Sequence, residues 1–119
     1  MGTPIQGQVV MLENNATLLG SILNSSITAN SNIFSSDLSI SQPSKVKIIV
    51  LASASASGTL SLVVTSGTTT IGGSLNSGNA ITGGAWYEFE IDLPSGVSLN
   101  LQYSVSATMT IFVLVTPLG

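Results

Sequence analysis

Apolar and polar residues alternate along most of this chain, and the alternation is broken at short intervals by glycine, proline, asparagine and serine. It is clearest over residues 86–93, where apolar side chains occupy the odd positions and mostly acidic side chains the even ones. A period of two places successive side chains on opposite faces of a β-strand. Because no segment shows the 3.6-residue period of an amphipathic helix, the pattern predicts an all-β fold.

Turn-forming residues divide this alternation into short candidate strands. Residues 45–53 become apolar on both faces toward their end, which predicts a central strand covered on both sides. Residues 72–84 contain five glycines and are predicted to be mostly loop. The candidate strands cover residues 7–12, 17–23, 32–40, 45–53, 59–66, 68–71, 80–82, 86–93, 97–105 and 108–116.

Antiparallel strands in this number must form two layers, since a single flat sheet would leave its apolar face in water. We therefore predict a single-domain antiparallel β-sandwich, and a jelly roll of eight or nine strands fits the strand count best. An immunoglobulin-like sandwich is the alternative, although the chain has no cysteine for its usual core. Residues 1–16 are predicted to form an N-terminal arm or first strand, and residues 17–119 the sandwich.

Charged residues are scarce: the chain has two lysines, Lys45 and Lys47, and five carboxylates, but no arginine, histidine or cysteine. Without an imidazole or a thiolate, the commonest general bases and nucleophiles are missing, which argues against an enzyme. Two lysines cannot form the basic patch that nucleic acid requires. We therefore expect no catalysis, no cofactor and no nucleic-acid partner.

The longest apolar runs, residues 48–52 and 111–115, are much shorter than the ~20 residues of a membrane-spanning helix. We therefore expect no integral membrane span. The first residues also lack the basic and apolar regions of a secretory signal, so we expect either that the chain is used as translated or that Met1 is an addition to it.

Glu88, Glu90 and Asp92 form the one acidic cluster in the sequence. On a strand they share one face, with successive residues about 7 Å apart. They are a weak candidate for a Ca²⁺ site or for the carboxylate pair of a glycosidase. Spacing along one strand does not converge oxygen atoms on an ion, so the favoured interpretation is a solvated face, with lysines of a neighbouring strand as counter-ions.

Trp86 and Tyr87 follow the glycine pair Gly83-Gly84. Exposed aromatic rings beside a glycine loop could stack on a sugar, as in β-sandwich carbohydrate-binding modules. More often such a pair straddles the sheet, with one ring toward the core and the other at a rim or an interface. On this basis Trp86 is also a candidate interface residue.

Other candidate sites lie near the N-terminus. Asn15 and Asn24 begin sequences that match the N-glycosylation motif, although chance matches are expected in a chain rich in asparagine, serine and threonine. Ile5, Val9 and Val10 are candidate interface residues in the predicted arm.

The segments 34–40, 45–53, 58–64, 85–93 and 97–115, with their uncharged Ser/Thr/Ala/Val texture, resemble small β-sandwich virion proteins of archaeal viruses from hot acidic habitats. The resemblance covers most of the chain. It implies a single jelly roll that serves as a capsid, penton or turret subunit, assembles around a symmetry axis and catalyses nothing. The expected partners are then further copies of the chain and other virion proteins, and the expected location is the virion, assembled in the host cytoplasm.

Two other functions remain open from the sequence. The chain could be an extracellular, pilin-like filament subunit whose N-terminal strand completes the sheet of the next subunit by donor-strand exchange. It could also be a β-sandwich carbohydrate-binding module that uses Trp86 and Tyr87.

Overall fold

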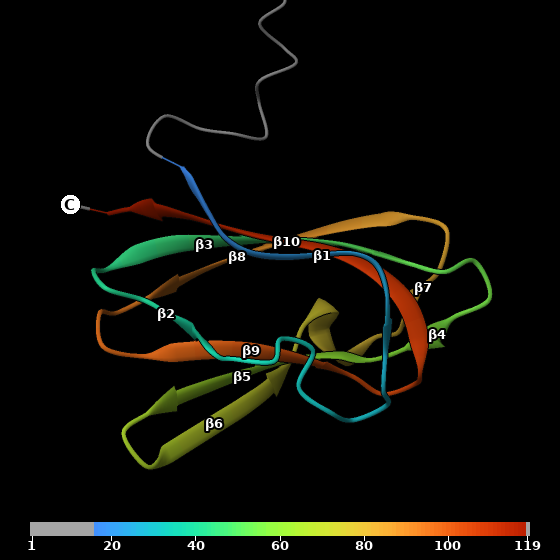
Figure 1. The fold of residues 1–119 in the computed structure, drawn as a ribbon, viewed down its shortest axis with the longest axis horizontal. Helices are drawn as coiled ribbons and strands as arrows, with labels where there is room; N and C mark the ends of the chain where they lie inside the picture. Colours follow the sequence, from blue (N-terminus) through green and yellow to red (C-terminus); the bar gives the residue numbers. More distant parts are fainter. Residues whose placement is uncertain (1–15, 119) are drawn as a thin grey trace, which may run out of the picture.

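The computed structural model describes residues 16–118, which form antiparallel strands and one short 3₁₀ turn, η2 (Figure 1). No helix within these residues is long and apolar enough to cross a membrane. The predicted strand 7–12, the interface candidates Ile5, Val9 and Val10, and Asn15 lie outside the described residues. The elements are β1 (Thr17–Ile27), β2 (Leu38–Ser39), β3 (Ser44–Ala52), β4 (Ser57–Gly58), β5 (Leu60–Ser66), β6 (Thr69–Ser74), η2 (Asn76–Gly78), β7 (Ile81–Thr82), β8 (Trp86–Leu93), β9 (Ser98–Tyr103) and β10 (Ala107–Pro117).

Two four-stranded sheets face each other, one in the order β1-β10-β3-β8 and the other in the order β2-β9-β5-β6 (Figure 1). Strands β4 and β7 form a separate two-stranded ribbon. When the eight strands of the large sheets are numbered along the chain, the orders become 1-8-3-6 and 2-7-4-5, which is a jelly roll. The prediction of an all-β antiparallel sandwich of the jelly-roll type is confirmed. The strand order differs from that of the immunoglobulin-like alternative.

The core lies between the two sheets and is built from the inward positions that the alternation predicts. Strand β3 is central, between β10 and β8, as predicted. Tyr103 is fully buried, and its hydroxyl donates a hydrogen bond to the carbonyl of Ile81 on β7. Burial raises the pKa of this phenol. The fully buried aliphatic side chains are Val46, Ile48, Val50, Leu60, Ile81, Leu99, Leu101, Ile111 and Val113.

The prediction of one strand over residues 32–40 is wrong. Only β2 pairs regularly, with β9, and Asn32 makes an isolated bridge to Gln102. Between Asn32 and β2 the chain forms bends and no strand. There the backbone N–H of Phe34 donates to the side-chain oxygen of Asn100 at 2.9 Å, in place of a bond to a neighbouring strand. Asn100 points away from the core, but the 32–37 loop covers it and leaves it 2% exposed.

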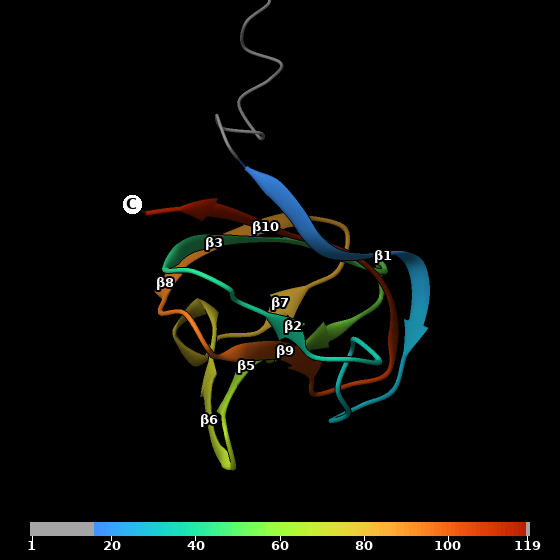
Figure 2. The same ribbon diagram turned by 60° about the vertical axis from the view of Figure 1, so that its left-hand side comes forward.

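Strands β5 and β6 form a hairpin that projects from the body of the sandwich (Figures 1 and 2). Its turn contains Gly67, whose φ of +61° lies in the left-handed region that glycine adopts at no steric cost. Strand β6 continues to Ser74, beyond the predicted 68–71, so part of the predicted 72–84 loop is strand.

Candidate binding face

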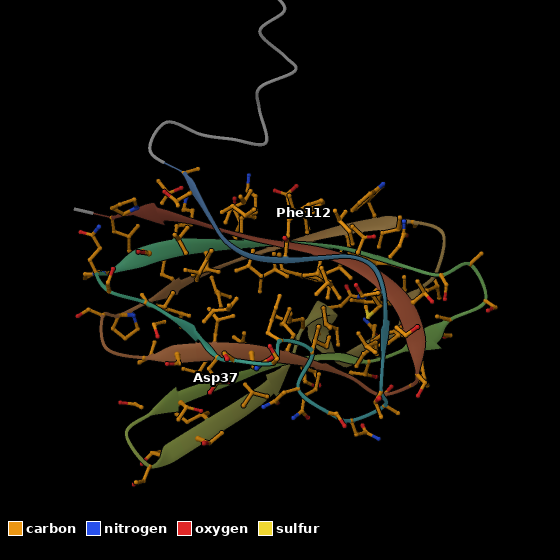
Figure 3. All side chains as sticks on the ribbon, viewed as in Figure 1. Asp37 and Phe112 are labelled. Carbon is orange, nitrogen blue, oxygen red and sulfur yellow. The ribbon has the colours of Figure 1, made fainter. Side chains whose placement is uncertain are left out.

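The outer face of the β1-β10-β3-β8 sheet carries two aromatic rings side by side. Trp86 on β8 is 56% exposed, and Phe112 on β10 is half-buried. Their ring centroids are 6.5 Å apart and their planes differ by 19°. Figure 3 labels Phe112 on this sheet and Asp37 beside the opposite sheet. The two rings are stacked on each other on the outer side of the sheet, and we call this part of the surface the Trp86–Phe112 face.

Strand register explains why residues so distant in the sequence meet here. On β3, Leu51 lies opposite Trp86, and Ile49 lies opposite Phe112. Directly opposed residues of antiparallel strands point to the same side of the sheet. Trp86 and Phe112 thus flank β3 from either side, on the same side of the sheet as Ile49 and Leu51.

The glycine pair Gly83-Gly84 fixes the start of β8. The N–H of Gly83 donates to the carbonyl of Ala56 at 2.8 Å, and that of Gly84 to the carbonyl of Ala52 at 3.0 Å. A Cβ atom on Gly83 would lie 1.5 Å from the carbonyl oxygen of Ser53. The backbones approach so closely that only glycine fits, and this contact positions the strand that begins with Trp86.

Trp86 and Tyr87 straddle the sheet. The Tyr87 ring lies on the core side and stacks on Phe89, with centroids 6.4 Å apart. Its hydroxyl lies 3.1 Å from the Thr82 hydroxyl and accepts the Thr82 N–H at 3.3 Å. These hydrogen bonds lower the pKa of Tyr87. The ring that accompanies Trp86 on the outer face is Phe112, which the sequence reasoning missed because it lies in an apolar run.

A hollow of about 470 Å³ opens on this face and is lined by Ile49, Trp86, Tyr87, Glu88 and Phe112. Its walls are mostly aromatic and aliphatic, while Glu88 supplies a carboxylate. Apolar walls with a few polar groups are typical of small-ligand sites.

The predicted acidic residues lie along the same face. The ammonium of Lys47, whose side chain is 13% exposed, is 3.2 Å from Glu88 Oε2 and 3.6 Å from Glu90 Oε2. Asp92 lies opposite Lys45 in the strand register. Within residues 16–118, no group of three or more histidine, cysteine, aspartate or glutamate residues could hold a metal ion. Glu88 and Glu90 are instead held by one ammonium group.

Asn24, the glycosylation candidate within the described residues, is exposed on β1, in the bulge between Ile22 and Ser25. Its backbone N–H donates to the Thr110 hydroxyl at 3.0 Å, and its φ is +46°. Its place on an edge strand leaves the motif accessible from solvent.

No family model and no curated protein sequence matches this chain. Among solved structures, it is similar to a chain of the endo-1,4-beta-D-xylanase 10B of Clostridium thermocellum that comprises the CBM22-1 and GH10 modules, in complex with xylohexaose. The TM-score is 0.51 at 12% sequence identity, and the match covers 91% of this chain but 26% of that chain. At this identity the similarity shows a shared β-sandwich fold alone.

Proposed function

We propose that this protein is a non-catalytic carbohydrate-binding β-sandwich, and that the Trp86–Phe112 face is its binding surface. The observation that carries the proposal is the nearly parallel pair of rings, 6.5 Å apart, beside an open hollow. The C–H groups on the flat side of a sugar ring are slightly positive and pack against the negative face of an aromatic ring.

Polar groups beside the rings suit the hydroxyls of a sugar. Glu88 and Glu90, whose side chains are 53% and 43% exposed, can accept hydrogen bonds from hydroxyl groups. With no arginine and a net charge of −3, the chain is unsuited to anionic ligands such as sulfated or uronic-acid glycans. The proposed ligand is therefore a neutral glycan. The similar xylanase chain contains a CBM22-1 module and is complexed with xylohexaose, a neutral oligosaccharide of the class proposed here.

The proposal is tested by affinity electrophoresis through gels containing neutral polysaccharides such as xylan, β-glucan and mannan. At least one polysaccharide should retard the wild-type protein. Trp86→Ala and Phe112→Ala should each weaken retardation by about tenfold or more, a loss that corresponds to about 1.4 kcal/mol. Leu23→Ala is the matched control, since Leu23 is an apolar side chain that is 66% exposed on β1. The proposal would be contradicted if no polysaccharide retarded the wild type, or if the wild type and all three variants were retarded equally.

A second candidate function is the structural subunit of a virion. Jelly rolls occur both in viral capsid proteins and in lectins, so the fold is compatible with either function. The observation that favours an assembly role is strand β6, an exposed sheet edge without charged residues. Electron microscopy of concentrated protein distinguishes the two candidates, because a shell subunit forms closed particles, whereas a glycan-binding module does not.

A further inference from the structure

Strand β6 is an open edge of the second sheet. It pairs with β5 in the order β2-β9-β5-β6, and all six of its residues are exposed. Its register with β5 runs without a bulge from Ser61↔Ser74 to Ser66↔Thr69. Proteins normally protect such edges with lysines, prolines, bulges or covering loops. The sequence of β6, TTIGGS, contains no charged residue and no proline.

The direction of the backbone groups follows from the hydrogen bonding. Just beyond β6, the N–H of Leu75 donates to the carbonyl of Leu60 at 2.8 Å. Because successive residues of an antiparallel strand point alternately to either side, Thr70, Gly72 and Ser74 turn their N–H and C=O groups away from β5. These three residues form a regular row of donors and acceptors along the outer edge.

The two glycines of β6 are not required by the fold of the chain itself. Neither Gly72 nor Gly73 has a positive φ. A Cβ on Gly72 would make an ordinary contact, 3.6 Å from the Leu62 carbonyl oxygen, and a Cβ on Gly73 would meet nothing within 4 Å. Glycine inside a strand weakens it and often marks a place where another backbone approaches closely.

Ile71, in the middle of β6, is an apolar side chain that no other part of the described chain covers. It lies opposite Val64, and Gly73 lies opposite Leu62, so these side chains share the face of the hairpin that looks toward the core. Ile71 nevertheless remains 67% exposed because the hairpin projects from the sandwich (Figure 2). On this face of β6, the exposed side chain of Ile71 therefore lies beside open space at Gly73, which has no side chain.

We propose that β6 pairs antiparallel with β6 of a second copy of this chain, around a two-fold axis at Gly72. In this register Gly72 lies opposite Gly72 of the second copy, and Thr70 lies opposite Ser74 of the second copy. All the outward N–H and C=O groups then find partners. Ile71 packs over Gly73 of the second copy, and by symmetry the reverse contact forms as well.

The second copy is the occupant that fits this edge because the edge complements itself. Opposite Ile71, Gly73 of the second copy leaves open space into which the isoleucine side chain can extend. The absence of charge on β6 means that two copies do not repel each other there. The joined sheets would leave the Trp86–Phe112 faces, which belong to the other sheet, free on both subunits. A multivalent glycan could then bind both faces with increased avidity.

Sedimentation velocity of the full chain across a range of concentrations tests the pairing. The wild type should show a monomer–dimer equilibrium. Gly73→Val fits the isolated subunit, and valine favours strands, so this variant should melt higher as a monomer while its dimer dissociation constant rises about tenfold or more. Ile71→Lys should weaken the dimer equally, since it places an ammonium group in the contact.

Leu23→Lys is the matched control, because it adds the same charge at an equally exposed site on β1, the edge of the other sheet. It should leave the dimer unchanged. A monomer at all concentrations, or a dimer that survives both β6 variants, would overturn the inference. Neither result would bear on glycan binding, which requires only the Trp86–Phe112 face.

Discussion

The side-chain amide of Asn100 is 2% exposed and satisfies every one of its hydrogen-bonding positions. Its oxygen accepts the N–H groups of Phe34 and Leu101, both at 2.9 Å. Its nitrogen donates to the Phe34 carbonyl at 2.9 Å and to Asp37 Oδ1 at 2.8 Å. One side chain therefore replaces a strand partner for the 32–37 loop, and buried amides of this kind are costly to remove.

Asn100→Ala should lower the free energy of unfolding by about 2–3 kcal/mol, because buried groups of Phe34 and Leu101 lose their partner. Urea denaturation measures the change. Gln102→Ala is the control: Gln102 is on the same face of β9 and makes one exposed hydrogen bond, to Asn32 at 2.8 Å. It should cost less than about 1 kcal/mol. Similar losses for both variants would contradict the assigned role of Asn100.

Gly83 gives a second test at the residue scale. Gly83→Ala puts a methyl group where the Ser53 carbonyl lies, so the β8 entry must shift and stability should fall by about 1–3 kcal/mol. Gly73→Ala, at a site with free space, should be neutral or slightly stabilising when measured on the monomer. Thermal melting checks both variants. A Gly83→Ala protein as stable as the wild type would show that the close approach is absent.

At the scale of strands, the sequence is a good guide to each element and a poor guide to its neighbours. The alternation identifies β8 and its faces, because a period of two is a local property. It cannot show that β10 lies two strands away, so the pairing of Phe112 with Trp86 is invisible in it. The 32–37 loop was mispredicted for the same reason, since its alternation is overridden by the distant Asn100.

The acidic strand gives a prediction at the element scale. The Lys47 side chain is 13% exposed, but its partners Glu88 and Glu90 are 53% and 43% exposed, so water screens these ion pairs and they contribute about 0–1 kcal/mol. Changing Glu88 and Glu90 to Gln and Asp92 to Asn should therefore alter the unfolding free energy by less than about 1 kcal/mol. Calorimetry with and without Ca²⁺ measures this. A Ca²⁺-dependent melting temperature that disappears in the triple variant would mean that the carboxylates bind the ion.

For the whole molecule, all eight strands of the jelly roll lie within residues 17–117. Both four-stranded sheets are built from strands within the described residues 16–118. A donor-strand filament requires the opposite, an incomplete domain that borrows a strand from its neighbour.

A variant lacking residues 1–12 should consequently be soluble and melt cooperatively. Circular dichroism during heating checks this outcome. A protein that folds only after a peptide of residues 1–12 is added, together with linear fibres from the full chain, would favour the donor-strand filament.

The central claim, a glycan-binding Trp86–Phe112 face, is tested most directly by the fluorescence of Trp86, the single tryptophan of the chain. Because Trp86 is 56% exposed, a sugar stacked on its ring replaces water and should shift the emission to shorter wavelength. Titration with a neutral oligosaccharide such as xylohexaose or cellohexaose should give a saturable shift that Phe112→Ala weakens. Emission that stays unchanged with every neutral glycan up to millimolar concentration would contradict the claim.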